Sequence, residues 1–534
     1  MNSTNNRKRR RQVTYEAKDK KKKPKKMTAE HRQVLQQYTE AKEYRKGFED
    51  TWRRNLKYYL GDHWAVGGSA QIDRPNLNNS PKDWRPVINI CFKNIETTLP
   101  ILADIEPTLY VDTSTPNDNP KARELSKKFQ LLIQQEWRDK NVRNSLWTGL
   151  KAGLIYGTSA FFTQVTPEIE KIDIGFEVIP LDPFEFFIDP FAKQFEDSEF
   201  FIRRVALSDQ QIKDFYGINR AVKADEESET LKDNQSDVEK YYVDEFWTPE
   251  KVYTIMGEQV VKEEDNDRSV IPFSLYVDYD VPGRLYGMGE IDVIIDVQRE
   301  LNKRAYQIIR NADLMGAGQW KVTDAGIEIT NEPGEKIVVP WGEEAEKVMP
   351  MQLPSAYYTQ MQMIIKFGEM ISGVNELTAG NIGSKDMSGD AIALLKHSNY
   401  NRIRQKSRNL ELTLSSISKH VAQIIQDYYR TERKVQTPDG ETVAVNGAEM
   451  AEEEFKIEIV PGTVQMRNKQ GDEQKALALY QMGAFGDPES YEAKEELLTA
   501  LHYPGKDRVL ARMNKGGNNG QRETENRSRA QENS

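Results

Sequence analysis

The sequence has only one cysteine and five histidines among its 534 residues. Cys91 has no second cysteine with which to form an internal disulfide, and a single thiolate cannot build a cysteine-ligated zinc site. Because its neighbours Ile90 and Phe92 are apolar, we expect Cys91 to pack as a small hydrophobic residue rather than to act as a nucleophile. The histidines lie at positions 31, 63, 397, 420 and 502 without metal-ligand spacing. The sequence therefore predicts no structural metal and no cofactor.

Long hydrophobic runs are missing as well. No stretch approaches the roughly 18 consecutive apolar residues of a membrane-spanning helix, and the N-terminus lacks the apolar core of a signal peptide. We therefore expect a protein that has no membrane partner and stays in the compartment where it is made. Apolar residues make up 38% of the chain and charged residues 30%, so much of it faces water. The length allows roughly two to four structural units.

Nucleotide-binding and catalytic motifs are incomplete. The nearest approaches to a Walker phosphate loop, at 380–386 and 504–508, lack the Gly-Lys-Ser/Thr core, and YGMGEID at 286–292 lacks the third glycine of a dinucleotide fingerprint. Four aspartates offer a carboxylate metal site for a nuclease, but three of them occupy turn or strand-edge contexts that favour Asp for backbone reasons. They are Asp182, Asp189, Asp197 and Asp296. We expect a protein that is not an enzyme, with a metal-dependent nuclease as an alternative.

Positive charge is concentrated at the N-terminus. Residues 1–26 carry twelve Lys and Arg against Glu16 and Asp19, and the net charge of −10 for the whole chain leaves about −20 on the rest. Such a segment cannot bury enough apolar surface to fold, so we predict a disordered arm that meets phosphates or an acidic partner through charge. A nuclear-targeting signal and a solvated terminus without a specific role are the alternatives. The clustered basic residues are Arg7, Lys8, Arg9, Arg10, Arg11, Lys20, Lys21, Lys22, Lys23, Lys25 and Lys26.

Hydrophobic periodicity predicts a mixed fold that is mainly α-helical with small β-sheets. Apolar residues at helical spacing predict helices over 29–60, 86–100 and about 120–157. Between Gly157 and Gly289 the period becomes strand-like, and short β-rich runs alternate with Thr-Pro and Asp-Pro turns. Helices return after Gly289 as a pair that flanks a compact insert, which we therefore expect at the tip of the pair.

A polar loop and then a long helix follow this pair. About forty helical residues would span roughly 60 Å. One narrow apolar seam runs along the helix between charged side chains and needs neighbours to cover it, which a ring of identical copies would supply. The seam residues that we expect to pack between subunits of the ring are Ile403, Leu410, Leu414, Ile417 and Val421.

Six segments occur in a characteristic order along the chain. They are WRRNLKYYLGDHW (52–64), RPVINICFKNIE (85–96), LKAGLIYGTSAFF (150–162), IPLDPFEFFIDP (179–190), YGMGEIDVIIDVQRELNKR (286–304) and MSGDAIALLKHSNYNRIR (387–404). With the succession of helix, insert, helix, loop and long helix, they resemble the portal proteins of tailed bacteriophages, the head-to-tail connectors. The resemblance covers nearly residues 30–510.

This resemblance implies a portal-like organisation of the chain, assembled as a ring. The implied parts are a disordered basic arm (1–28), a wing-like α/β region (29–286), a first stem helix (287–315), a clip-like insert (316–352), a second stem helix (353–373), a channel loop (374–388), a long channel helix (389–430), a crown-like C-terminal region (431–514) and a disordered tail (515–534). The basic arm has no counterpart in the general family pattern.

The resemblance also implies a function and partners. Subunits, usually about twelve, would form a ring at one capsid vertex of the virion, after synthesis in the host bacterial cytoplasm, and double-stranded DNA would pass through the channel during packaging and ejection. The implied partners are the terminase large subunit, a head-completion or adaptor protein, and the major capsid and scaffold proteins. An acidic body suits such a channel, because DNA binds most strongly where many Lys and Arg neutralise phosphates.

Two groups of contact residues follow from these implied parts. In the channel loop, Lys385 is the expected phosphate contact, with Asn381 and Ser384 as weaker hydrogen-bond partners. In the insert, four residues are candidates for partner docking, with local core as the alternative: Trp320, Val338, Val339 and Trp341. For the whole chain, a nucleic-acid-binding scaffold that uses its basic arm is the alternative function.

Overall fold

The computed structural model gives the arrangement of most of the regular elements. The residues it describes are 28–64, 85–103, 109–113, 120–168, 173–217, 240–316, 319–322, 341–342, 344–348, 355–374, 401–429, 431–436, 442–446, 455–459, 476–487 and 490–501. The basic arm, the channel-loop residues Asn381, Ser384 and Lys385, and Val338 and Val339 lie outside these residues.

Helices α1 (Ala29–Leu60) and α2 (Ile90–Ala103) begin the described chain, and α1 has the ends that its sequence predicts. Thr28 caps α1 by accepting a hydrogen bond from the His31 backbone N–H, and Gly61 ends it at a φ of 87°, in the left-handed region. Cys91 on α2 is fully buried, as predicted.

The helix predicted over about 120–157 is two helices. Helix α3 (Pro120–Asp139) ends before a turn in which Asn141 has a φ of 50°, and α4 (Val142–Tyr156) then runs to Gly157. Asn tolerates the left-handed conformation better than most residues, because its side chain is short and polar. The apolar periodicity continues across the turn and therefore conceals the break.

Two antiparallel sheets follow in the region where the sequence predicts strands. A three-stranded sheet has the order β3-β2-β9, and a five-stranded sheet has the sequential order β4-β5-β6-β7-β8. Their strands are β2 (Thr158–Glu168), β3 (Asp173–Leu181), β9 (Phe273–Val277), β4 (Phe186–Ile188), β5 (Phe201–Ser208), β6 (Lys240–Trp247), β7 (Lys251–Met256) and β8 (Gln259–Asp265). Helix α5 (Asp209–Tyr216) follows β5 and begins with a capping box formed by Ser208 and Gln211.

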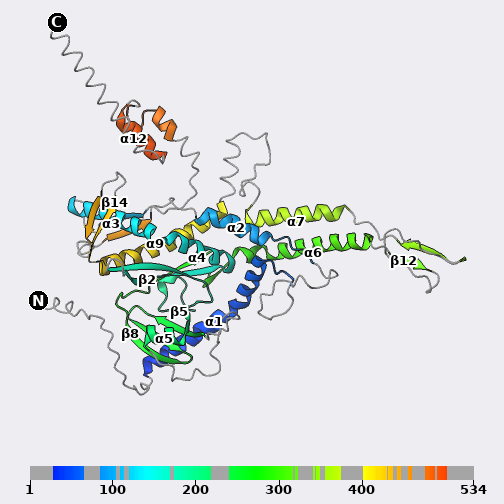
Figure 1. Cartoon of the computed structure of the whole chain (residues 1–534), viewed down its shortest axis with the longest axis horizontal. Helices are drawn as coiled ribbons and strands as arrows, with labels where there is room; N and C mark the ends of the chain where they lie inside the picture. The colour runs from blue at the N-terminus through cyan, green and yellow to red at the C-terminus, as the bar shows by residue number, and fades with distance from the viewer. Residues whose placement is uncertain are drawn as a thin grey trace, which may run out of the picture.

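A helix pair projects from the body that contains these sheets (Figure 1). The hairpin of β10 (Tyr279–Val281) and β11 (Arg284–Met288) leads into α6 (Glu290–Gly316), and α7 (Ala356–Ser372) returns alongside α6. Strands β12 (Gln319–Val322) and β13 (Ala345–Val348) form a hairpin beyond the far ends of both helices. The described part of the insert therefore lies at the far end of the helix pair.

Helix α9 (Asn401–Tyr428) packs across the three-stranded sheet, and C-terminal strands cover the neighbouring surface. Strands β14 (Glu432–Gln436) and β15 (Thr442–Asn446) pair with each other, whereas β16 (Phe455–Ile459) pairs with β1 (Leu109–Thr113). This last pairing joins the C-terminal region to the segment between α2 and α3. Helix α12 (Tyr491–Ala500) is the last described helix.

Candidate functional site

Buried amides fasten the base of the projecting helix α6 to α2. Gln298 accepts a hydrogen bond from the Ile90 backbone N–H at 2.8 Å and donates to the Ile88 carbonyl at 2.7 Å. Asn302, one turn further on, accepts from the Ile88 N–H at 3.1 Å. Both amide side chains are buried. The sequence analysis missed them, although two amides at i and i+4 on the apolar stripe of α6 were a signal for a buried polar contact.

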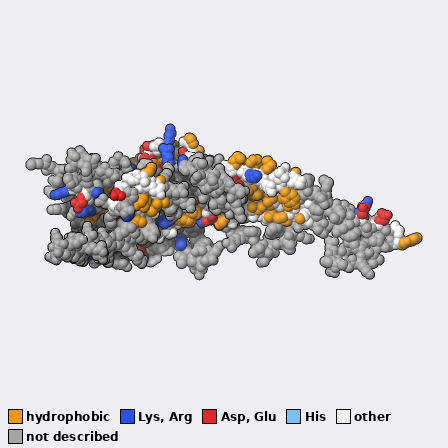
Figure 2. Space-filling view, turned by 90° about the horizontal axis from the view of Figure 1, so that it is seen from above, with side chains coloured by type: hydrophobic (Ala, Val, Ile, Leu, Met, Phe, Trp, Pro, Cys, Tyr) orange, Lys and Arg blue, Asp and Glu red, His pale blue; other side chains and the backbone are white. Residues whose placement is uncertain are grey.

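Helix α7 leaves an apolar stripe uncovered. Its inner side sits close to the body at Gly368, where a Cβ atom would lie 3.1 Å from Ile90 Cδ1. Met363, Phe367 and Met370, at spacings of four and three residues, are 48%, 48% and 69% exposed. Figure 2 shows hydrophobic side chains gathered over the helix pair. These three residues, called the α7 stripe below, form an apolar surface on a projecting element.

The hairpin at the tip carries an aromatic side chain in full contact with solvent. Trp320 lies on β12 opposite Lys347 of β13, and Trp341, in the turn before β13, is completely exposed. For Trp341 the structure therefore disfavours the alternative of a local core and leaves its side chain free to contact a partner. The exposed indole presents a large apolar surface and an N–H donor at the far end of the projection.

The seam of α9 is covered by the chain itself and not by another copy. Leu410, Leu414, Ile417 and Val421 are each at most 2% exposed in the single chain, and Ile403 lies on the first turn of the helix. Polar contacts align the helix with β9, including a 2.9 Å hydrogen bond from Thr413 Oγ1 to the Leu275 carbonyl. The four buried side chains consequently offer no surface to a neighbouring subunit. This corrects their assignment to ring packing, because the three-stranded sheet of the same chain already buries the apolar seam.

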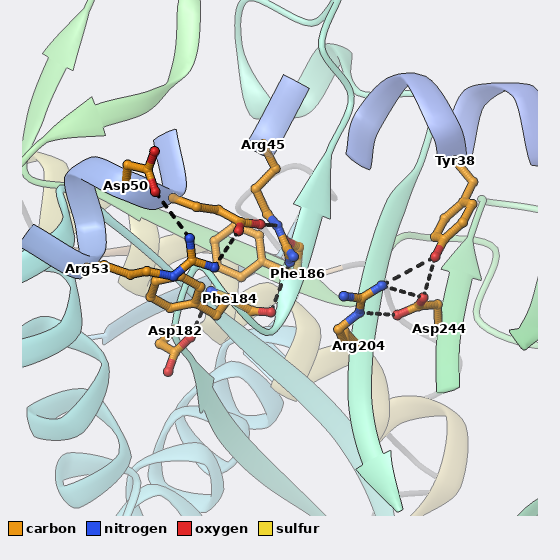
Figure 3. A network of polar contacts seen from close by, with 10 residues as sticks. Tyr38, Arg45, Asp50, Arg53, Asp182, Phe184, Phe186, Arg204 and Asp244 are labelled. Carbon is orange, nitrogen blue, oxygen red and sulfur yellow. Dashed lines mark hydrogen bonds and ion pairs between the residues drawn. The ribbon is translucent and has the colours of Figure 1, made fainter. Parts of the chain in front are cut away.

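A polar network fastens α1 to the five-stranded sheet (Figure 3). Arg204 on β5 donates two hydrogen bonds, of 2.8 and 3.0 Å, to the carboxylate of Asp244 on β6. Tyr38 on α1 donates to the same carboxylate at 2.7 Å. All three side chains are buried, and burial, followed by the charge of Asp244, raises the pKa of Tyr38. The tyrosine is thus a hydrogen-bond donor throughout the neutral pH range.

Arg45 makes a second connection from α1. Its guanidinium donates to the carbonyl oxygens of Phe184 and Phe186, at 2.9 and 3.3 Å, and to Glu49 at 3.0 Å. The central carbon of the guanidinium also lies 3.8 Å from the centre of the Phe187 ring. Figure 3 shows the polar contacts of Arg45. The network has the properties of a structural joint, because Arg45, Arg204 and Asp244 are buried and their charged groups have partners within the chain.

The four aspartates of the nuclease alternative serve the backbone or the surface. Asp182 and Asp189 each accept a hydrogen bond from the backbone N–H two residues on, at 2.8 and 2.9 Å, as turn residues do. Asp197 lies in a short 3₁₀ turn, and Asp296 pairs with Arg299 on the exposed side of α6. Among the described residues, no three His, Cys, Asp or Glu side chains converge on a possible metal position. Within the same part of the chain, no helix is long and apolar enough to cross a membrane.

Comparison with known proteins identifies the family. The family model for the phage P22-like portal protein matches residues 251–534, more than half of the chain. The chain belongs to this family, whose members are generally structural proteins of the virion and not enzymes. The match includes the helix pair, its tip hairpin and α9.

No curated protein matches the chain. A solved chain described as "Virion of native gene transfer agent (GTA) particle" is similar over 76% of this chain and 89% of its own length, with 9% sequence identity and a TM-score of 0.40.

Proposed function

We propose that the chain forms a ring at the capsid vertex and that double-stranded DNA passes through this ring during packaging and ejection. Membership of the phage P22-like portal family supports a role at the vertex. The observation that carries ring assembly is the α7 stripe, because Met363, Phe367 and Met370 remain about half exposed or more in the isolated chain. A second copy of the chain is the occupant that a closed ring supplies.

The exposed stripe has an energetic reason to be covered. Fully burying a Met or Phe side chain contributes about 1.5–3 kcal/mol, so three such residues can stabilise a subunit contact appreciably. Lys93 and Glu369, whose charged groups lie 3.6 Å apart beside the stripe, add polar surface at its edge. An apolar centre with a polar rim is typical of stable protein interfaces.

Charge supports passage of DNA without tight binding. Outside residues 1–26 the chain carries about −20 net charge, which opposes general adhesion to a duplex. Lys385, with Asn381 and Ser384, makes weak phosphate contacts in the channel, and such contacts carry no base information. The tip hairpin with Trp320 and its exposed Trp341 docks the terminase large subunit during packaging and a head-completion protein afterwards. The nucleic-acid-binding scaffold is less well supported, because the portal family match lies in residues 251–534 and does not involve the basic arm.

Charge substitutions on the α7 stripe test ring assembly. Phe367→Glu and Met370→Glu should each raise the protein concentration needed for assembly at least tenfold, because a carboxylate would be buried at the contact. Light scattering would measure particle mass, and negative-stain microscopy would show whether rings with an axial hole form.

Gln362→Glu is the matched control, since Gln362 is exposed on the same helix but lies about 80–140° around it from the three stripe residues. This variant should assemble as the wild type does. Rings of unchanged size and concentration dependence from both stripe variants would reject the α7 stripe as the subunit contact.

A further inference from the structure

Three charged side chains meet in the interior where α9, β9 and α6 join. Asp278 follows β9, Glu290 is the first residue of α6, and Lys406 lies on α9. Lys406 Nζ donates to both carboxylate oxygens of Asp278 and lies 3.0 Å from Glu290 Oε1. The three side chains are 1%, 0% and 2% exposed for Lys406, Asp278 and Glu290, respectively.

The hydrogen bonds of this cluster leave one carboxylate oxygen without a partner. The ammonium has three N–H groups, and its three nearest acceptors are the two oxygens of Asp278 and Oε1 of Glu290. Glu290 Oε2 is buried without a hydrogen-bond partner. With all three groups ionised, the cluster would also hold a net charge of −1 away from water. Both the orphaned oxygen and the excess charge are costly in a protein interior.

The other groups around the cluster do not neutralise this charge. Tyr276 on β9 donates to Asp278 at 3.2 Å, and the Tyr279 ring on β10 lies 3.8 Å from Lys406 Nζ. Tyr279 Oη lies 3.4 Å from Glu290 Oε1, and burial raises the pKa of both phenols, so they stay neutral. On α2, burial raises the pKa of the Cys91 thiol to about 12, which leaves it neutral as well. No second cation contacts the cluster among the described residues.

We propose that Asp278, Glu290 and Lys406 together bind one proton near neutral pH, and that its release weakens the attachment of α9 to β9 and α6. With the proton bound, the cluster is one cation, one carboxylate and one carboxylic acid, and its net charge is zero. The acid also supplies an O–H donor, which the two ionised carboxylates lack.

The direction of the Asp278 pKa agrees with this geometry. Burial raises the pKa of Asp278 to about 7, although Lys406 acts in the opposite direction, and the charge of Glu290 adds to the rise. A carboxyl group in an unfolded or opened segment has a pKa near 4. The closed junction therefore binds more protons than the opened one between about pH 4 and pH 7, and its stability falls as the pH rises through this range. Above about pH 7 the loss is complete and stability levels off.

Hydrogen exchange across pH tests the proposal in the intact full-length protein. The protection factors of amides in 401–428 and 273–281, corrected for the intrinsic exchange rate, should fall by up to about tenfold per pH unit between pH 5 and 7. In Asp278→Asn and in Glu290→Gln this fall should disappear, because the remaining carboxylate and Lys406 are already neutral together. An infrared band of a protonated carboxyl group should be present at pH 6 in the wild type and lost at pH 8.

Asp280→Asn is the matched control, since Asp280 is exposed two residues from Asp278 and accepts from Gln405 on the same helix α9. It should keep the pH dependence of the wild type. If Asp278→Asn does not fold, Glu290→Gln and the infrared band decide the question. A flat protection profile in the wild type, an unchanged slope in Glu290→Gln, or the absence of the infrared band at pH 6 would each overturn the proposal.

Discussion

Buried ionic side chains connect elements that lie far apart in the sequence. Arg204 and Asp244 join two strands and reach Tyr38 on α1, while Glu136 on α3 forms an ion pair with Arg433 on β14. All five side chains are at most 8% exposed. An intact buried pair adds little net stability, whereas removing one partner leaves an uncompensated charge and is strongly destabilising. Replacing a single residue of these networks is therefore expected to lower the free energy of unfolding strongly.

Asp244→Ala should lower the free energy of unfolding by about 3–5 kcal/mol, because it removes the carboxylate that accepts from both Arg204 and Tyr38. Urea unfolding followed by circular dichroism would measure the change. Asp50→Ala is the control, since Asp50 is 98% exposed and pairs with Arg53 at the surface. Equal unfolding midpoints for the two variants would show that the buried network carries no special weight.

At the scale of elements, local signals predicted more than long-range ones. The ends of α1 at Gly61 and of α4 at Gly157, and the Ser208 capping box, were readable because a cap depends on a few neighbouring residues. The turn at Asn141 was not, since hydrophobic spacing continues through it. The pairing of β1 with β16 joins residues almost 350 positions apart, and no local pattern specifies such a partner.

The candidate site was predictable to a similar degree. Helical periodicity placed the insert at the tip of a helix pair and identified the seam of α9, but it did not identify what covers each surface. A seam of Leu and Ile has the same pattern whether it packs on a sheet or on another subunit. The exposed α7 stripe went unnoticed for the same reason, because Met363, Phe367 and Met370 have the spacing of an ordinary buried face.

The covered seam leads to a prediction for α9. Leu414→Glu should destabilise the fold by several kcal/mol, because Leu414 is 1% exposed and a carboxylate there would have no partner. Leu412→Glu should change stability by less than about 0.5 kcal/mol, since Leu412 is 66% exposed on the same helix. Thermal unfolding of both variants measures the difference. Comparable losses in both, or a normally stable Leu414→Glu protein, would contradict the packing of α9 on the sheet.

At the scale of the whole molecule, charge and shape are both unevenly distributed. The helix pair and its hairpin project from one side of the body (Figure 1). Residues 1–26 carry a net positive charge, whereas the rest of the chain carries a net charge of about −20. A body of this sign repels a duplex over distances of about 8–10 Å at moderate salt, beyond which counterions screen it. Any strong attraction for nucleic acid is therefore expected to reside in the arm.

Removing residues 2–26 should accordingly abolish most binding of random-sequence duplex DNA at low salt. Each phosphate neutralised by Lys or Arg contributes about −0.9 to the slope of log K against log salt concentration. Replacing Arg7, Lys8, Arg9, Arg10 and Arg11 by Gln should therefore make the slope less steep by up to about 4–5, with no change in preference between sequences. Fluorescence anisotropy of a labelled duplex at several salt concentrations measures both effects, and Lys419→Gln, an exposed change on α9, is the control. A truncated protein with the same affinity and the same slope would assign DNA binding to the acidic body and leave the arm as a solvated terminus.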